Sequence, residues 1–249
     1  MIRAVTFDFW DTIVIDESDE IARKAMGLAP KREARWHLFR DAVAAQSDLP
    51  ESQVRAAFDA ANDHFRYQWK VEHHTPHIRL RLLDAYARLD LPPGPGFDAL
   101  VTATGDMEVV NPPLLAPGIA EALTALKPKY KLGVISDTIV TPGTGLRTLL
   151  DRYELLDLFD FFVFSDEVGA SKPAPAVFHA AAIGLGVEVS EIAHVGDREE
   201  NDVIGPRTVG ARGVLYTGVV DRGAATTLAD AVCAHHHDLP GILAGWEAQ

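Results

Sequence analysis

Residues 2–12 read IRAVTFDFWDT, a short apolar run that ends on the acidic side chain of Asp8. Four later runs are similarly rich in branched and aromatic residues, with helical patterns between the later ones. Such runs are typical of strands buried on both faces. Strands that alternate with helices predict an α/β fold, with a mainly parallel sheet covered by helices on both sides. The five predicted strands are Ile2–Phe7, Leu132–Ile135, Phe161–Phe164, Ile192–Val195 and Val214–Tyr216.

Three of these predicted strands lead directly into a polar residue. Asp8 follows the first strand, Ser136 follows the second, and Gly196-Asp197 follows Val195. In open parallel sheets the ligand site lies beyond the carboxyl ends of the strands. We therefore expect these three side chains at one functional edge of the sheet.

A long segment between the first two predicted strands, residues 16–108, has no comparable apolar run. Its apolar residues recur every three or four positions, which predicts amphipathic helices packed into a small bundle. The chain thus divides into an α/β core of residues 1–15 and 109–249 and an inserted helical domain of residues 16–108. The spacing also makes Phe65 and Trp69 core residues of the bundle. The periodic positions are Trp36, Phe39, Val43, Val54, Phe58, Ala61, Phe65, Trp69, Ile78, Leu82, Tyr86 and Leu89.

The chain of 249 residues carries a formal net charge of −13, which restricts its partners. Such a charge repels nucleic acid and anionic membranes, so we expect neither as a partner, whereas a small anionic substrate in a locally positive pocket is compatible. The sequence predicts no particular oligomeric state.

The start of the chain lacks a signal-peptide pattern, and no stretch approaches the roughly 20 apolar residues that span a bilayer. The single cysteine, Cys233, falls in a predicted late helix and fits a reducing compartment. These features predict a cytoplasmic protein. The tract His235–His237 would point in three directions on a helix, which disfavours a metal site.

Three further motifs follow Asp8 along the chain, each beside a predicted strand. They are Ser136-Asp137-Thr138, Lys172-Pro173 and Gly196-Asp197-Arg198-Glu199-Glu200-Asn201-Asp202. In this order and context, the four motifs resemble those of the haloacid dehalogenase superfamily of hydrolases. The resemblance covers the whole chain and implies a Rossmann-like core, residues 1–15 and 109–249, with a helical cap of the C1 type, residues 16–108.

The resemblance also implies the roles of the polar residues. Asp8 corresponds to the nucleophile of the family, Ser136 to the residue that binds the transferred group, and Lys172 to the lysine that steadies both. Thr12 and Asp137 join Ser136 and Lys172 as substrate-binding residues. Preorganised donors at the strand-to-helix turn after Ser136 suit phosphoryl oxygens.

A divalent cation fits the same chemistry. An aspartate that attacks phosphorus approaches a group that is itself anionic, so the site needs cations to cancel the repulsion. Magnesium prefers hard oxygen ligands and shares substrate phosphate oxygens. The resemblance implies Asp8, the backbone carbonyl of Trp10 and Asp197 as its ligands, with Asp202 bound directly or through water.

Each of the remaining motif residues also has a purely structural interpretation. Ser136 could cap a helix, Lys172 could be a solvated loop lysine, and Asp202 could cap the helix that starts nearby. The position of Ser136 at the predicted functional edge favours the site interpretation. For Lys172 only its place between two motifs favours it, and capping by Asp202 is compatible with support of a metal.

Trp10 departs from the pattern of the family's phosphatases, which carry a second Asp two residues after the nucleophile. That Asp protonates the leaving alcohol and then activates water. An indole cannot exchange protons at neutral pH, and loss of general acid–base catalysis typically costs about 100-fold to 10,000-fold in rate.

Three explanations of Trp10 stay open. The dehalogenase branch also carries an aromatic residue there, attacks carbon and needs no metal, although the pair Asp197 and Asp202 resembles the metal-binding form of the fourth motif. Alternatively, the leaving group needs no protonation, as in an acyl or aryl phosphate, or a cap lysine assists it. As the third explanation, Asp11 could replace the missing acid. Its side chain, one position further along the chain, should point in a different direction. The lysines of the insert considered for this role are Lys24, Lys31 and Lys70.

The sequence therefore favours a magnesium-dependent, phosphatase-type hydrolase that acts on a small phosphorylated substrate through an aspartyl-phosphate intermediate. The alternatives are a 2-haloacid dehalogenase-like hydrolase and a catalytically silent member of the family that binds a phosphorylated ligand.

Overall fold

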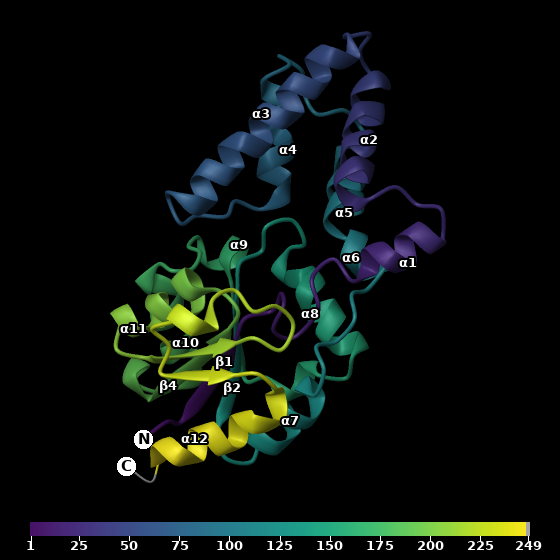
Figure 1. Ribbon diagram of the computed structural model, residues 1–249. Helices are drawn as coiled ribbons and strands as arrows, with labels where there is room; N and C mark the ends of the chain where they lie inside the picture. The colour runs from purple at the N-terminus through teal and green to yellow at the C-terminus, as the bar shows by residue number, and fades with distance from the viewer. Residues whose placement is uncertain (248–249) are drawn as a thin grey trace.

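The computed structural model describes residues 1–247 and contains a six-stranded, fully parallel sheet in the order β3-β2-β1-β4-β5-β6 (Figure 1). The predicted α/β fold with a parallel sheet is thereby confirmed. Five strands coincide with the apolar runs of the sequence, within two residues at each end. The strands are β1 (Ala4–Phe7), β2 (Lys131–Ser136), β3 (Phe161–Phe164), β4 (Ile192–Gly196), β5 (Arg212–Tyr216) and β6 (Ala231–Cys233).

Helices cover both faces of the sheet, which explains why its strands are apolar throughout. Val5 and Phe7 of β1 pack in one apolar cluster with α7 (Ile119–Leu126), α8 (Gly143–Arg152) and α12 (Leu239–Glu247). Ala4 belongs to a cluster on the other face with residues of α10 (Pro175–Leu185), which α11 (Gly205–Thr208) follows along that side. β1 is fully buried because it lies at the centre of these layers.

Seven helices lie between β1 and β2 in the chain, and the first six of them, α1 to α6, lie above the sheet in Figure 1. Four of them, α2 to α5, share an apolar cluster of their own that includes Trp36, Phe39 and Tyr86. The boundaries 15/16 and 108/109 of the proposed core and cap stay a prediction. The helices are α1 (Asp19–Ala25), α2 (Lys31–Ala44), α3 (Glu51–Lys70), α4 (Ile78–Ala87), α5 (Phe97–Gly105) and α6 (Met107–Val110).

Short helical turns connect the remaining strands. They include η1 (Leu156–Leu158), α9 (Ser165–Val168), η2 (Val189–Glu191), the π-helical turn η3 (Glu199–Ile204), η4 (Ala224–Thr226) and η5 (His236–Asp238).

The C-terminal segment differs from the sequence-based prediction at Cys233. Cys233 lies in β6 and not in a helix, because this three-residue strand pairs with β5 at the edge of the sheet. In the histidine tract, His235 and His237 stack on each other, while His236 is fully buried. Buried His236 thus anchors the tract in the protein interior.

Buried His236 fixes the backbone of the first motif. Its Nε2 lies 2.8 Å from the carbonyl oxygen of Thr12, and its ring stacks on Tyr216 at a centroid distance of 3.9 Å. Because a carbonyl can only accept, Nε2 carries the proton and the buried Nδ1 has no hydrogen-bond partner. Burial lowers the pKa of His236 to about 4.

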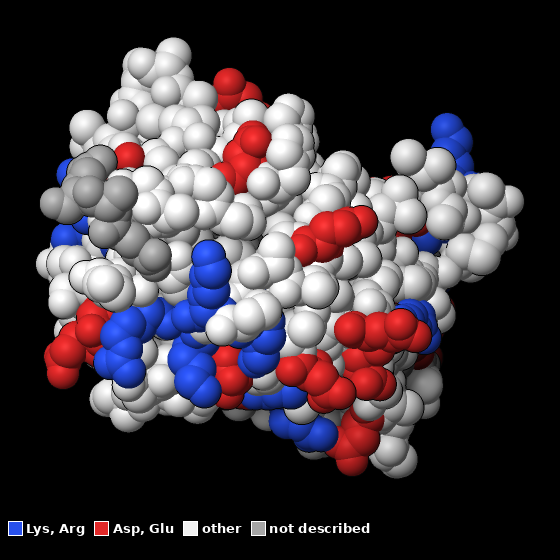
Figure 2. Space-filling model, turned by 90° about the horizontal axis from the view of Figure 1, so that it is seen from below, with Lys and Arg blue, Asp and Glu red and all other residues white. Residues whose placement is uncertain are grey.

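Residues 1–247 contain no helix with the length and apolar character needed to cross a membrane. Figure 2 shows the side of the molecule that lies away from α2 to α5. A group of Lys and Arg side chains there lies next to Asp and Glu side chains, so neither charge covers this face.

Protonation of His236 should destabilise the fold at mildly acidic pH. Its pKa in the folded chain lies below the ordinary value of 6.5, so its contribution to stability is complete above pH 6.5 and is lost as the pH falls toward 4. Between pH 7 and 4.5 we expect the free energy of unfolding to fall by about 2 kcal/mol more in wild type than in His236→Phe. Urea denaturation at both pH values measures this difference, and parallel losses in the two proteins would contradict it.

Candidate active site

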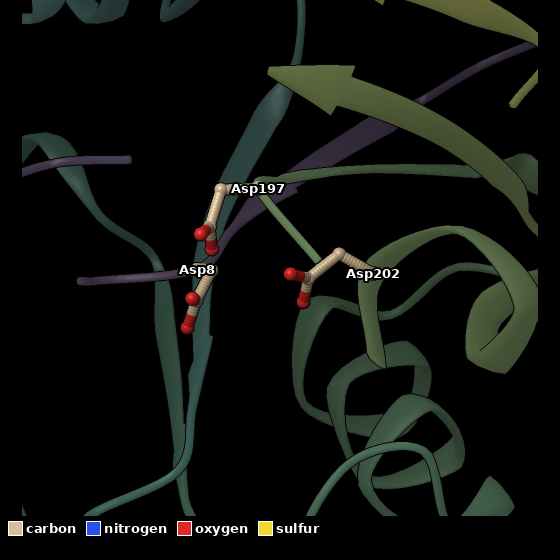
Figure 3. Close-up of side chains that lie close together, drawn as sticks. All are labelled: Asp8, Asp197 and Asp202. Atoms are coloured by element: carbon tan, nitrogen blue, oxygen red, sulfur yellow. The ribbon is translucent and has the colours of Figure 1, made fainter. Parts of the chain in front are cut away.

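The three predicted polar residues meet at one edge of the sheet because β2, β1 and β4 are neighbours. Asp8 directly follows β1, and its amide donates to the carbonyl oxygen of Val195 at 2.8 Å. Ser136 ends β2, and Asp197 follows β4. Figure 3 shows the carboxylates of Asp8 and Asp197 beside each other, with the carboxylate of Asp202 approaching them from η3.

Lys172 supplies a buried positive charge to this edge. Its Nζ lies 2.8 Å from Oδ1 of Asp8 and 2.6 Å from Oδ1 of Asp202, and its side chain is only 2% exposed. Burial alone would lower the pKa of Lys172, but the carboxylates of Asp202 and Asp8 raise it above its ordinary value. Lys172 is therefore a buried cation and not a solvated loop lysine.

The two carboxyl groups that contact Lys172 have pKa values shifted in opposite directions. Burial raises the pKa of Asp8, and the charge of Lys172 only partly opposes this. Burial acts in the same direction on Asp202, but Lys172 and His194 outweigh it and hold the pKa of that carboxyl well below its usual range. Asp202 is thus the permanent counter-charge of Lys172.

Asp202 is held by three donors in a tightly packed turn. Its Oδ2 accepts from the amide of Arg198 at 2.9 Å, and its Oδ1 accepts from Lys172 and from Nε2 of His194. A Cβ at Gly196 would lie 2.3 Å from the carboxylate carbon of Asp202, so only glycine fits at the end of β4. Asp202 does not cap a helix, because it lies inside η3.

His194 was not singled out by sequence reasoning. It lies within β4, fully buried, with Nε2 3.1 Å from Oδ1 of Asp202 and Nδ1 2.9 Å from Oγ1 of Thr6. Burial lowers its pKa, so the ring is neutral, donates to Asp202 and accepts from Thr6. A histidine in an apolar strand gives no sequence signal for this role.

The three carboxylates form a group suited to a cation. One oxygen of each of Asp8, Asp197 and Asp202 lies within 4.8 Å of the others. Oδ1 of Asp197 is buried and has no hydrogen-bond partner, and burial, Asp8 and Asp202 raise the pKa of Asp197 to about 6. A buried carboxylate oxygen without a donor fits a hard divalent cation such as Mg²⁺.

Asp11 and Arg222 form a second ion-pair arrangement beside the carboxylates. The guanidinium of Arg222 donates through Nε to Asp197 and through Nη2 to Oδ2 of Asp11 at 2.7 Å. Oδ1 of Asp11 accepts from the amide of Asp16 at 3.0 Å. Both carboxylate oxygens of Asp11 are therefore engaged by these donors. Arg222 was missed, and the only available signal was its place in the loop after β5.

Two hydroxyl groups at this edge have no partner within the described residues. Oγ of Ser136 and Oγ1 of Thr12 are both buried and make no hydrogen bond. Ser136 does not cap a helix, because α8 begins at Gly143. Buried hydroxyls are normally satisfied, so both are available to oxygens of a ligand.

The indole of Trp10 belongs to the apolar packing. It is half-buried against the main core cluster, with its ring centroid 5.1 Å from that of Phe9 in an edge-to-face arrangement. Position 10 therefore carries no ionisable side chain that could transfer a proton.

Asp137 connects the sheet edge to the helices above it. Its Oδ1 accepts from the amide of Lys172 at 2.9 Å, and its Oδ2 accepts from Nε1 of Trp69 at 2.9 Å and from Nδ2 of Asn201 at 3.3 Å. Burial raises its pKa to about 6. Trp69 is thus a contact to the site and not a core residue of the bundle, whereas Phe65 is buried as predicted.

The loop between α3 and α4 also lies against the sheet domain. The amide of Ser171 donates to the carbonyl oxygen of His73 at 2.7 Å, and the hydroxyl of Thr75 donates to Ser165. These contacts hold the loop beside Lys172.

A cavity of about 240 Å³ lies at this junction. Of the three lysines considered as leaving-group acids, Lys70 lines it together with Lys172, whereas Lys31 is bound to Asp19 and Glu108. Lys24 is exposed on α1. His73 and Lys70 are the ionisable cap residues in this cavity.

Comparisons with known proteins agree with this architecture. A family model described as haloacid dehalogenase-like hydrolase matches residues 2–210. A glyceraldehyde 3-phosphate phosphatase of Pyrococcus abyssi is 29% identical over 221 residues, which cover 87% of this chain and 82% of the relative.

Two solved structures share the fold over nearly the whole chain. A HAD phosphatase from Thermococcus onnurineus has a TM-score of 0.65 at 25% identity and covers 98% of this chain and 99% of its own. A 2-haloacid dehalogenase from Pseudomonas syringae has a TM-score of 0.64 at 23% identity, with coverage of 99% and 100%.

Trp69→Phe should loosen the contact between the α3–α4 loop and the sheet domain. The change removes one donor from the buried Asp137 carboxylate, and a lost hydrogen bond of this kind costs about 1 kcal/mol. We expect roughly 5-fold faster amide hydrogen exchange in residues 71–77 and at Ser171. Trp246→Phe, in α12, is the matched control and should leave this exchange unchanged. Equal exchange in Trp69→Phe and wild type would refute the coupling.

Proposed function

The chain belongs to the haloacid dehalogenase-like hydrolases, and from this premise we propose that it is a magnesium-dependent phosphatase acting on a small phosphorylated substrate through an aspartyl-phosphate intermediate. The observation that carries the proposal is the arrangement around Asp8. This carboxylate ends the central strand, contacts Lys172 and lies beside the unpartnered oxygen of Asp197.

In the proposed first step, a carboxylate oxygen of Asp8 attacks the phosphorus atom. A bond forms between this oxygen and phosphorus while the bond from phosphorus to the leaving oxygen breaks. In the second step, water attacks phosphorus while the bond from phosphorus to the Asp8 oxygen breaks. Inorganic phosphate leaves, the protons of the water pass to phosphate or solvent, and the Asp8 carboxylate is restored. Lys172 orients Asp8 and offsets the negative charge that gathers on the phosphoryl oxygens.

The proposed magnesium ligands are Asp8, the carbonyl oxygen of Trp10 and Asp197, with Asp202 supporting the site. Because both oxygens of Asp202 already accept hydrogen bonds, we assign it contact through water rather than a direct bond. When bound, the cation offsets the charge of the substrate phosphate.

The proposed phosphoryl-binding groups are the side chains of Ser136, Thr12 and Lys172. The two hydroxyls are buried and free to donate to phosphoryl oxygens. Asp137 has a positioning role, because its contacts hold the amide of Lys172 and the indole of Trp69. The relative named as a glyceraldehyde 3-phosphate phosphatase supports a small phosphorylated substrate.

A dehalogenase-like activity is the second candidate, and Trp10 is the residue that favours it. The buried group of three carboxylates argues against it, since attack on carbon needs no cation to balance a phosphate. A silent member that binds a phosphorylated ligand without turnover is the third candidate.

Exchange of Asp8 for Asn tests the nucleophile. We expect magnesium-dependent phosphate release by wild type from an aryl phosphate, and a loss of at least about 1,000-fold in Asp8→Asn, because the amide cannot form the intermediate. Asp11→Asn is the matched control and should keep phosphate release within about 10-fold of wild type, because Asp11 faces Arg222.

The same assay includes a chloroacid and a chelator. Chloride release that is insensitive to chelator would sink the phosphatase proposal in favour of the dehalogenase. Magnesium binding without turnover of any phosphate ester or acyl phosphate would favour the silent member.

Trp10 gives the proposed phosphatase a preference for good leaving groups. Without a protonating side chain at this position, we expect acetyl phosphate and aryl phosphates to have kcat/KM values about 100-fold above those of alkyl phosphates, because kcat/KM reports the step in which the leaving group departs. Trp10→Asp should narrow this difference by raising kcat/KM for alkyl phosphates. A plot of log kcat/KM against the pKa of the leaving group measures it, and a flat plot for wild type would show that another group, such as Lys70 or His73, supplies the proton.

A further inference from the structure

The helices above the sheet enclose a second cavity, larger than the one beside Lys172. Its volume is about 510 Å³, and it is lined by α2, α3 and α4 together with Ile139 and Val140 of the loop that follows the second motif. In Figure 1 these helices form the layer over the carboxyl edge of the sheet. Five arginines line this cavity against two aspartates, in a chain with a net charge of −13. The arginines are Arg32, Arg35, Arg55, Arg66 and Arg81.

Three of these arginines are already neutralised. Arg35 donates to both oxygens of Glu108 at 2.7 and 2.9 Å. Arg55 pairs with Asp59 at 2.8 Å, and Arg66 pairs with Asp63. Within residues 1–247, Arg32 and Arg81 have no carboxylate partner, so the cavity keeps an excess of positive charge.

Arg81 is the distinctive member of the group. Its guanidinium donates to the carbonyl oxygen of Ile139 and, through Nη1, to Oδ1 of Asn62 at 3.3 Å. Its Cζ lies 3.4 Å from the ring centroid of Phe65, and its Nε is buried without a hydrogen-bond partner. Burial and the nearby Arg35 lower the pKa of Arg81 to about 9.

Arg81 is half-buried with a fully buried Nε, and a guanidinium withdrawn from water in this way is costly without a counter-charge. Glu108 does not supply this counter-charge, because it already pairs with Arg35 and Lys31. Arg81 therefore has only neutral hydrogen-bond partners and lies on a cavity wall. An anionic group of a ligand in the cavity would supply the missing counter-charge.

The cavity is linked to the proposed phosphoryl site through shared residues. Trp69 lines the cavity and donates to Asp137, whose carboxylate holds the amide of Lys172. Ile139, which accepts from Arg81, lies three residues after Ser136. A substrate with its phosphoryl group at Ser136 would have its remaining atoms directed toward this space.

We propose that this cavity binds a second anionic group of the substrate, so that the enzyme acts on small phosphate monoesters that also carry a carboxylate or a further phosphate. Arg81 is the main counter-charge, and Arg32 adds to it from the rim. The proposal rests on the proposed phosphatase function and narrows its substrate class.

The test compares substrates that share a three-carbon skeleton. Glycerol phosphate has no second anionic group, phosphoglycerate adds a carboxylate, and bisphosphoglycerate adds both a carboxylate and a further phosphate. We expect kcat/KM for at least one of the latter two to exceed that for glycerol phosphate by about 10-fold or more, mainly through KM. A higher kcat/KM for bisphosphoglycerate than for phosphoglycerate would identify the further phosphate as the group that Arg81 recognises. Otherwise the carboxylate is that group.

Arg81→Met should remove this preference and leave aryl phosphate turnover within about 2-fold of wild type. Arg81→Lys should restore part of it, because the charge is kept while the fork of donors is lost. Arg79→Met is the matched control on the same helix, since Arg79 is exposed and pairs with Asp98 outside this cavity. Loss of activity toward all substrates alike would assign Arg81 a structural role and overturn the proposal.

Arg32→Ala keeps the proposal testable if Arg81→Met does not fold. Arg32 is exposed, so its removal should leave the fold intact and weaken only the doubly anionic substrates, by about 3-fold. No selective effect of this change, together with equal kcat/KM values for the three substrates, would overturn the proposal.

A binding measurement separates this proposal from the phosphatase function. Calorimetric titration of Asp8→Asn with phosphoglycerate and glycerol phosphate needs no turnover. Tighter binding of phosphoglycerate, lost in the double variant with Arg81→Met, supports the cavity proposal even if wild type releases no phosphate. Equal binding of the two ligands contradicts it even if aryl phosphate hydrolysis is magnesium-dependent and requires Asp8.

Discussion

The ion pairs of Lys172 with Asp8 and Asp202 are the constraint on which the site depends. A buried ammonium is tolerated only where carboxylates offset the loss of hydration, and here two of them lie within 2.8 Å of Nζ. The close packing of Gly196, Asp202 and His194 fixes one carboxylate, and the end of β1 fixes the other. Removing Lys172 would leave both carboxylates buried without their shared counter-charge. The nucleophile is therefore held in place by the same interaction that stabilises this edge of the sheet.

The helices above the sheet are tied to that edge through polar contacts, in addition to Val140, which packs against their apolar cluster. Asp137 accepts from Trp69 on one side and from the amide of Lys172 on the other. Glu108 of α6 binds Arg35 of α2 and accepts from the hydroxyl of Thr141. Polar contacts of this kind are individually weak, which suits a layer that must admit and release a substrate.

The distribution of cations follows from the proposed chemistry. Lys172 stands at the reacting centre, whereas unpaired Arg81 lies in the cavity farther along the helices. In an acidic chain, these local positive sites would attract a small anion while the remaining surface repels larger polyanions. Because Trp10 cannot donate a proton at neutral pH, the leaving group must obtain its proton from another source or leave without one.

Local patterns in the sequence determined the parallel sheet, its apolar strands and the edge at which Asp8, Ser136 and Asp197 meet. These follow from strand periodicity and from the rule that parallel strands end together. Only the tertiary structure decided that Trp69 contacts Asp137, that Arg222 bridges Asp11 and Asp197, and that Cys233 ends a strand. The side-chain contacts among these join residues 25 to 211 positions apart. Their directions are set by how whole helices and loops pack, so no spacing within the sequence encodes them.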